Sequence, residues 1–444
     1  MKNGFGGVIA LTALVLAMPG SAAAAGFAVA EQSPGGMSTA FSNAAAVEDA
    51  SVIWYNPAGM GFLGGTNITA GGTIILPYSD FDIDGGETTN AAGAAQTGGD
   101  GDDGGVAKLA PVFYISNEIR AVEGLSIGLG VNSPFGLVTA YENGWVGRYA
   151  GLASEMLSVN INPAISYRVL PWLSVGGGVS IMYMRTDLSQ AIDATALATG
   201  NAASGLDDSR VDLDASGWGY GFNAGIMVQP WEGGRFGAHY RGPVSFTDLK
   251  GEAIFIHGAT GAAVSAGTGT LVNTATSADL TMPESISING YQELTDSLAI
   301  HGDVTWTRWS RVETISIGLG NPLQAGPSLD FSYSDSWRVA LGATYDVDDD
   351  MTLRFGVAWD QSPQGDEVRG VRLPDNDRYW FSTGMSWDIN NVVQVNGGYT
   401  FLYIKRATTD IVTPTVGGGG NRTSGTFGGI VHLLAGQVVL KFDP

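Results

Sequence analysis

Histidines are the residues best suited to acid–base chemistry in this chain, which has four: His239, His257, His301 and His432. His301 and Asp303 are two residues apart in an alternating segment, so they share a predicted strand face and can touch. A hydrolase also needs a nucleophile within hydrogen-bond reach of its base. No serine is evidently placed to be activated in this way. We therefore predict that the chain is not an enzyme.

Metal binding is the second chemistry to consider, because acidic residues cluster between positions 80 and 103. The cluster comprises Asp80, Asp82, Asp84, Glu87, Asp100, Asp102 and Asp103. Carboxylates of this kind can bind divalent cations, but a solvated, glycine-rich loop has the same composition, and we favour the loop. The segment 100–104 lacks the ligand spacing and closing glutamate of an EF-hand. We predict no metal site and no cofactor.

Composition narrows the class of protein. The 444 residues include 43 acidic and 21 basic side chains, a formal net charge of −22, and no cysteine. Such a chain cannot neutralise a phosphate backbone, so nucleic-acid binding is excluded, as are disulfide scaffolds and thiolate metal sites. Charged residues make up only 14%, with 66 glycines, unlike an ordinary soluble domain. Disorder is excluded because 44% of the residues are hydrophobic.

The N-terminus has the features of an export signal. Lys2 precedes an apolar run over residues 8–18, and small residues end at Ala24. This order is typical of a cleaved signal peptide, whereas a permanent anchor helix would need a longer run. We assign residues 1–24 to the signal peptide, so the protein is exported.

Alternation with a period of two is the dominant pattern in the rest of the chain. Residues 336–346 and 351–360 each place large apolar side chains on one face and small or polar ones on the other. A soluble sandwich turns the apolar face inward, whereas an outer-membrane barrel turns it toward lipid. The strands are about ten or more residues long, as a tilted bilayer crossing requires. Trp and Tyr at their ends, such as Trp337 and Tyr345, fit an interfacial girdle, which favours the barrel.

The number of candidate strands is even, about 14, as in bacterial barrels. They lie near residues 66–78, 107–117, 123–132, 155–168, 172–185, 216–229, 234–242, 277–290, 297–308, 335–346, 350–360, 378–389, 392–405 and 429–442. Short turns alternate with long segments, 243–276 among them, which places both chain ends on the periplasmic side. Pro283 should force a bulge or kink, because it cannot donate to the ladder. We predict an all-β transmembrane antiparallel barrel over residues 66–444.

Residues 25–65 do not alternate. They are small, sparsely charged and broken by glycine and proline, which suits short helices in a confined space. A free periplasmic tail fits this composition poorly, so we predict a plug, or hatch, inside the barrel. Within it, proline holds Asn56 extended, and the Asn56 side chain can cap a short helix that begins with Pro57 and Ala58.

The chain resembles the FadL family of outer-membrane transporters for long-chain fatty acids and other hydrophobic compounds. The resemblance covers nearly the whole mature chain, and the shared order of several motifs carries it. They are Ala25-Gly26-Phe27, Asn56-Pro57-Ala58, Asn132-Ser133-Pro134-Phe135-Gly136-Leu137, Leu280-Thr281-Met282-Pro283-Glu284, Thr307-Arg308-Trp309-Ser310, Trp359-Asp360-Gln361-Ser362-Pro363 and Leu373-Pro374-Asp375-Asn376-Asp377-Arg378-Tyr379-Trp380.

The resemblance implies a monomeric barrel in the bacterial outer membrane, surrounded by lipid and lipopolysaccharide and closed by the hatch. It also implies capture of cargo between long loops, a pocket inside the barrel, and a lateral opening made by an inward kink of the third strand. We assign that kink to Ser133, Pro134, Phe135 and Gly136, where proline and glycine also disrupt pairing on physical grounds. The chain ends Phe442-Asp443-Pro444, whereas barrels of this type usually end in an aromatic residue.

The same resemblance implies a hydrophobic cargo, and it indicates which residues bind it. A fatty-acid carboxylate withdrawn from water needs a cation or hydrogen-bond donors. Arg185 matches a basic position of the family, so we predict that it binds the carboxylate; the alternative is an ordinary rim arginine paired with an acid. Phe27, Trp54 and Phe135 are the predicted apolar contacts.

The predicted function is passive uptake of long-chain fatty acids or similar hydrophobic molecules through a plugged barrel with a lateral exit. Monoaromatic hydrocarbons such as toluene are the alternative cargo, because they need no cation. A general porin for polar solutes is a further alternative, and it would conduct strongly where a plugged barrel would not.

Overall fold

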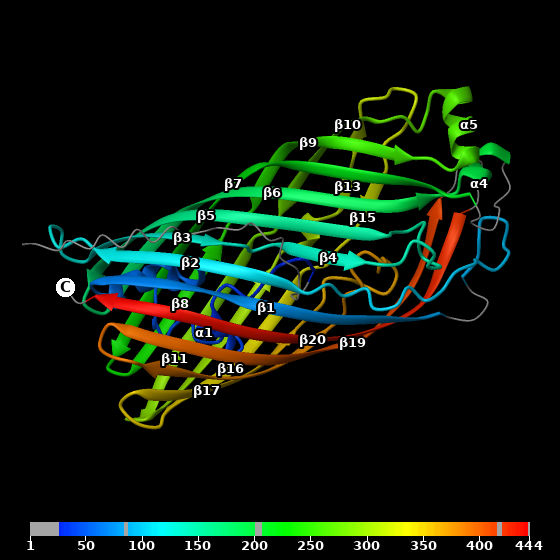
Figure 1. The fold of residues 1–444 in the computed structure, drawn as a ribbon. Coiled ribbons are helices and arrows are strands. Elements are labelled where there is room, and N and C mark those ends of the chain that lie inside the picture. Colours follow the sequence, from blue (N-terminus) through cyan, green and yellow to red (C-terminus); the bar gives the residue numbers. More distant parts are fainter. Residues whose placement is uncertain (1–25, 84–87, 200–206, 415–419, 443–444) are drawn as a thin grey trace, which may run out of the picture.

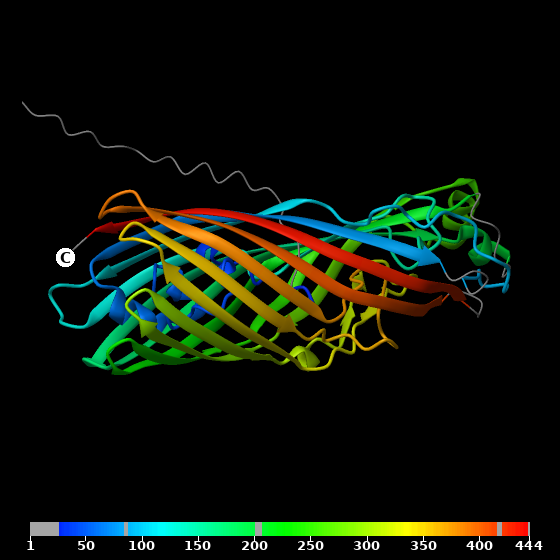
Figure 2. The same cartoon turned by 90° about the horizontal axis from the view of Figure 1, so that it is seen from below.

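The computed structural model describes residues 26–83, 88–199, 207–414 and 420–442, and they form one long barrel (Figures 1 and 2). The proposed signal peptide, residues 1–24, lies outside the described residues. The strands are β1 (Thr66–Ile83), β2 (Lys108–Glu118), β3 (Leu125–Asn132), β4 (Gly136–Ala140), β5 (Ala153–Leu170), β6 (Leu173–Ile192), β7 (Ser209–Trp231), β8 (Gly234–Arg241), β9 (Val244–Ile256), β10 (Thr274–Met282), β11 (Ser285–Thr295), β12 (Leu298–Thr307), β13 (Thr314–Ser316), β14 (Gly318–Leu319), β15 (Ser328–Asp330), β16 (Ser336–Asp346), β17 (Met351–Asp360), β18 (Arg378–Asp388), β19 (Val393–Pro414) and β20 (Gly420–Phe442).

The sheet closes on itself through its first and last strands. β1 pairs with β20 from Thr66 opposite Phe442 to Ile83 opposite Gly425, and with β2 on its other side; the ladders are antiparallel. β3 and β4 both pair with β5, and β8 and β9 both pair with β7, so each couple is two halves of one strand. β10 pairs with β9 and β11 pairs with β8, so β10 and β11 are likewise two halves of one strand. The barrel therefore has 14 strands, which confirms the predicted number.

The apolar strand faces point outward. Leu341, Phe355 and Phe381 are 62%, 52% and 53% exposed, whereas Arg354 and Ser382, on the opposite faces of their strands, are buried. Outward apolar and inward polar side chains are the arrangement of a barrel in lipid. No helix among the described residues is both long and apolar enough to cross a bilayer.

Several predicted strand ends were wrong. Residues 244–256, predicted to lie in a long loop, form β9, because Gly242 and Pro243 interrupt a strand that then continues. A similar break at Pro283 separates β10 from β11, as expected for a residue that cannot donate to the ladder. β6, β7, β19 and β20 also extend beyond their predicted bounds, and Figure 1 shows them reaching toward the end that carries α4 (Ala194–Thr199) and α5 (Ala259–Thr268). We call this the loop end, and the opposite one the turn end.

Short helices of the N-terminal segment lie inside the barrel (Figure 1). They are α1 (Pro34–Met37), α2 (Val52–Tyr55), η1 (Pro57–Gly59) and α3 (Met60–Leu63). α1 contacts β18, β19 and β20, while η1 contacts β5, β6 and β7. Ser33 caps α1, since its hydroxyl accepts from the backbone N–H of Gly36. We keep the name hatch for residues 26–65.

Candidate functional site

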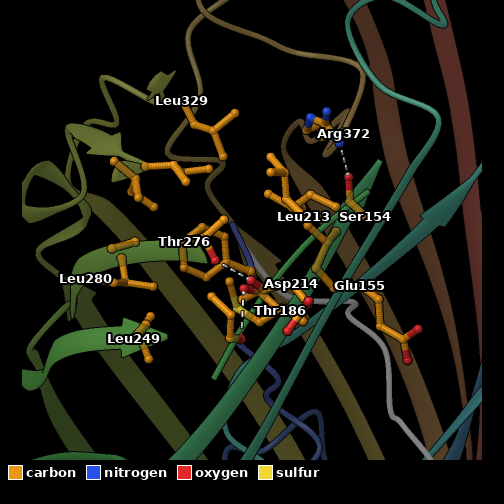
Figure 3. A pocket seen from close by; sticks show the side chains of 18 of the residues that line it. Ser154, Glu155, Thr186, Leu213, Asp214, Leu249, Thr276, Leu280, Leu329 and Arg372 are labelled. Carbon is orange, nitrogen blue, oxygen red and sulfur yellow. Dashed lines mark hydrogen bonds between the residues drawn. The ribbon is translucent and has the colours of Figure 1, made fainter. Parts of the chain in front are cut away.

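An apolar cavity lies between the hatch and the loop end. The cavity is open to solvent on one side, and the space within its lining is about 830 Å³. Its walls come from β4–β7, β9, β10 and the segments on either side of β16 and β17 (Figure 3). The large apolar side chains lining it are Phe27, Leu137, Met156, Leu188, Leu213, Leu249, Leu280, Ile315, Ile317, Leu329, Phe331 and Leu373. This lining suits an apolar molecule.

Phe27, a predicted ligand contact, lines this cavity and is 1% exposed. Its ring meets the Trp309 ring edge to face, with centroids 4.9 Å apart. The preceding Gly26 donates its backbone N–H to Asp375 Oδ2 at 3.0 Å and has φ +65°, and an added Cβ would lie 2.8 Å from the Trp309 ring. Only glycine fits there without strain, so Gly26 holds Phe27 against the cavity.

Arg372 is the cation of the cavity, and sequence reasoning did not assign it a role. Its Nη1 donates to Ser154 Oγ at 3.0 Å, as Figure 3 shows, and to the carbonyls of Ala153 and Ser189; its Nη2 donates to Gln190 Oε1. Among the described residues, no carboxylate lies within ion-pair distance of this guanidinium. Burial by protein atoms lowers the pKa of Arg372 to about 10. The guanidinium therefore has no ion-pair partner among the described residues, and the carboxylates that line the same cavity are those of Glu155 and Asp214.

Arg185, the predicted carboxylate ligand, lies elsewhere. Its side chain is 59% exposed, and its Nε is 2.8 Å from Asp187 Oδ2. Met182 and Met184 of β6 are buried in the barrel, so by alternation Arg185 belongs to the outward face. Arg185 does not line the cavity, and its placement corresponds to the alternative, a rim arginine paired with an acid.

A second, polar chamber lies beside the hatch, and the space within its lining, which is open to solvent, is about 860 Å³. Trp54, a predicted ligand contact, lines this chamber rather than the apolar cavity. The Arg241 guanidinium stacks 3.4 Å from the centre of the Trp54 ring and donates to the Trp54 carbonyl. Asp303, Arg338 and Asp360 also line the chamber, so it suits water or a polar group better than a hydrocarbon chain.

Asn56 ties the hatch to the barrel wall. Its Oδ1 accepts from the N–H of Ala58, which caps the turn starting at Pro57, and its Nδ2 donates to the Ile226 carbonyl of β7 at 3.1 Å. A Cβ at Gly225 would lie 2.1 Å from Asn56 Oδ1, so this contact requires glycine in β7. The predicted helix start is present, and its cap also anchors the hatch.

The third strand is interrupted at Ser133, Pro134 and Phe135, between β3 and β4. The hatch pairs with the interruption: the Val29 N–H donates to the Pro134 carbonyl, and the Gly136 N–H donates to the Phe27 carbonyl. Phe135 is 7% exposed and belongs to the same apolar cluster as Phe27, although it does not line the cavity.

At the interruption, the side chain of Ser158 of β5 makes hydrogen bonds in place of the missing ladder bonds. Its hydroxyl accepts from the Phe135 N–H at 2.9 Å and donates to the Phe135 carbonyl at 2.7 Å, while Ser133 Oγ donates to the Ser158 carbonyl. These bonds satisfy backbone groups that the break would leave unpaired. The kink is therefore held to β5 by side chains.

The interruption leaves a stretch of the barrel wall in which two neighbouring strands are not joined by ladder bonds. β2 pairs with β3 only from Phe113 to Glu118, and β4 pairs with β5 alone. Residues 108–112 of β2 and 133–138 thus face each other without ladder bonds. We call this strip the wall gap. The Phe113–Val131 pair bounds it on one side, and the bridge of Gly105 with Thr139 bounds it on the other.

His301 and Asp303 do not form a catalytic pair. Asp303 accepts from Ser287 and Thr305. A serine does lie beside the histidine, contrary to the sequence analysis: Ser42 Oγ is 3.1 Å from His301 Nδ1. That hydroxyl donates to the Thr39 carbonyl, and both residues are buried outside the two cavities. Among the described residues, no group of three or more His, Asp and Glu side chains could hold a metal ion.

Comparisons with known proteins agree with this architecture. Residues 15–442 match the model of the family described as outer membrane protein transport protein (OMPP1/FadL/TodX). Outer membrane protein P1 of Haemophilus influenzae is 30% identical and is matched over 89% of each chain. The long-chain fatty acid transport protein of Escherichia coli K12 is 27% identical, over 89% of this chain and 91% of its own.

Solved structures share the fold. A Pseudomonas aeruginosa FadL homologue superposes with a TM-score of 0.87 at 22% identity, over 94% of this chain and all of its own. The Pseudomonas putida toluene transporter TodX gives a TM-score of 0.66 at 15% identity, over 89% of this chain and 94% of its own. The matched family is one of transport proteins, which confirms the prediction that the chain is not an enzyme. The chain belongs to the OMPP1/FadL/TodX family of outer membrane transport proteins.

Proposed function

We propose that the protein takes up long-chain fatty acids and similar hydrophobic molecules across the outer membrane, holding them in the apolar cavity before they leave through the wall gap. The single observation that carries the fatty-acid assignment is Arg372, a cation without an acidic partner among the described residues, in a lining that is otherwise mostly apolar. A long-chain fatty acid matches this site, because its acyl chain suits the apolar lining and its carboxylate suits the Arg372 guanidinium.

The driving force for capture is burial of the acyl chain of the cargo in the apolar cavity. Each CH₂ group moved from water to apolar contacts gains about 0.8 kcal/mol. The carboxylate would lose its hydration on entry, and the Arg372 guanidinium compensates with charge-assisted hydrogen bonds. An uncharged hydrocarbon gains from the lining but not from Arg372.

The wall gap supports a lateral exit because it adjoins the cavity. Leu137 of β4 lines the cavity, and its neighbours in the chain border the gap. Outside, Leu109 of β2 and Leu129 of β3 are exposed on the apolar surface of the barrel. Cargo leaving this way would pass from one apolar environment to another without crossing the polar chamber.

The test is binding of oleate and of toluene to detergent-purified protein, with Arg372→Gln and Arg185→Gln as a matched pair. Loss of a charge-assisted contact at Arg372 should weaken oleate binding about tenfold or more and leave toluene binding unchanged. Arg185→Gln should change neither ligand. If Arg372→Gln leaves oleate affinity unaltered while toluene binds tightly, the cargo is a neutral hydrocarbon and the fatty-acid assignment is wrong.

A further inference from the structure

An ion pair spans the wall gap. Lys108 Nζ of β2 lies 3.1 Å from Glu155 Oε1 of β5, and the two side chains are 14% and 33% exposed. β2 and β5 are not neighbours in the sheet, because β3 and β4 lie between them. The pair therefore bridges the two sides of the gap, where ladder bonds are absent.

The two side chains reach the gap from opposite faces of the sheet. Ala110 and Val112 are buried, so Lys108 belongs to the inward face of β2. Glu155 alternates with the buried Ser154 and Met156 and belongs to the outward face of β5; in Figure 3 its carboxylate points away from the apolar lining. With β4 displaced from β2, the ammonium can reach the outer side of β5.

The pair also lies at a border of the apolar surface. The residues that follow on the outward face of β2, Leu109 and Phe113, are exposed. On the other side of Glu155, by contrast, the neighbouring residue is charged, because Glu155 of β5 is paired with Asp187 of β6. Cargo entering the membrane through the gap would thus pass beside the ammonium immediately before it reaches hydrocarbon.

We propose that Lys108 and Glu155 form a charge-selective latch on the wall gap, which a cargo carboxylate opens by replacing the Glu155 carboxylate on the Lys108 ammonium. This inference rests on the proposed function. The exchange substitutes one carboxylate for another, so the ammonium keeps a partner throughout. An uncharged molecule offers no such partner and must break the ion pair to pass. The latch therefore favours acids over neutral compounds of the same chain length.

The experiment compares uptake of oleate with uptake of oleyl alcohol, which has the same chain without the carboxylate, into liposomes containing the full-length protein. Glu155→Gln should raise alcohol uptake about fivefold, as expected for loss of a partly exposed ion pair, and leave oleate uptake unchanged. Lys108→Gln should raise alcohol uptake and lower oleate uptake. The exchange variant Lys108→Glu/Glu155→Lys, which restores the pair, should return alcohol uptake to the wild-type level.

A second lysine provides the control. Lys250 pairs with Asp248 at 2.7 Å on an exposed surface, so Lys250→Gln should alter neither cargo. If the variants at Lys108 and Glu155 change both cargoes by the same factor, the pair is only structural and the latch is wrong. If wild-type protein takes up neither cargo, the proposed function itself has failed, so the two failures are distinguishable.

Cross-linking compares two forms of one variant, bridged and reduced, which carry the same charges at the gap. The chain has no cysteine, so Lys108→Cys/Glu155→Cys introduces the only thiols. A reducible bifunctional thiol reagent bridging them should block oleate uptake, and reduction should restore it. Unchanged uptake in the bridged protein would show that cargo does not use the gap.

Discussion

The rings of Phe27 and Trp309 meet edge to face, with centroids 4.9 Å apart and planes at 89°. Phe27 lines the apolar cavity and Trp309 lines the polar chamber, so the pair forms the partition between them. Phe27 belongs to the N-terminal segment, whereas Trp309 follows β12. The hatch therefore completes the cavity as well as filling the barrel.

Replacing Phe27 should join the two spaces. Phe27→Ala removes a buried aromatic contact worth about 1.5–3 kcal/mol, so oleate affinity should fall at least tenfold. Equilibrium binding to purified protein checks this. The outward Phe381→Ala, on the lipid-facing surface, should bind oleate like the wild type. Equal affinities for all three proteins would mean that Phe27 is not part of the binding site.

Ser158→Ala should loosen the kink of the third strand. The change removes both hydrogen bonds to Phe135 and leaves buried backbone groups unpaired, a cost of about 1–3 kcal/mol. Hydrogen exchange at residues 133–136 should accelerate accordingly. Ser166→Ala is the matched control, because Ser166 is buried on the same face of β5 and its hydroxyl has no hydrogen-bond partner. Similar exchange rates in both variants would contradict the anchoring role.

Asn56→Ala should weaken the attachment of the hatch. It removes the bonds to Ala58 and to the wall carbonyl of Ile226, again at about 1–3 kcal/mol. Single-channel recordings should show brief openings that are rare in the wild type. Asn117→Ala, at the turn end and outside the hatch, should leave the current at the wild-type level. Large steady conductance in the wild type would instead support the porin alternative.

Oleate binding should depend on pH through Arg372. Burial lowers the pKa of its guanidinium to about 10, so the group is charged at about pH 8 and loses its charge as pH rises through about 10. Oleate is ionised throughout this range, so its affinity should fall above about pH 10 in the wild type. Binding titrations at increasing pH measure the effect. Arg372→Gln should bind weakly with no such decline, and an equal decline in that variant would exclude Arg372 as its cause.

The sequence predicts the central part of each strand better than its ends. In the lipid-facing part, alternation of residues such as Val339 and Leu341 with small or polar ones is unambiguous. In residues 209–215 of β7, Val211 and Leu213 are buried and the alternate positions Arg210, Asp212 and Asp214 are charged, so the pattern of an exposed apolar face ends while backbone pairing continues. Breaks such as Gly242-Pro243 look like strand ends because glycine and proline interrupt the local strand pattern.

The site was only partly predictable. The break in the third strand and the turn before Phe27 are each marked by a short local motif, residues 132–137 and 25–27. Arg372 comes from a segment that reaches Ser154 through folding alone, across 218 positions, and no periodic pattern marks it. Arg185 lies in a strand where a shift of one residue exchanges the inward and outward faces, so its position in the chain was a poor guide to its environment.

The most direct test is a crystal structure of the protein with a bromine-labelled long-chain fatty acid. We expect anomalous bromine signal in the apolar cavity, among side chains such as Leu213 and Leu280, with the carboxylate at the Arg372 guanidinium. Bromine in the polar chamber, or a carboxylate bound away from Arg372, would contradict this expectation.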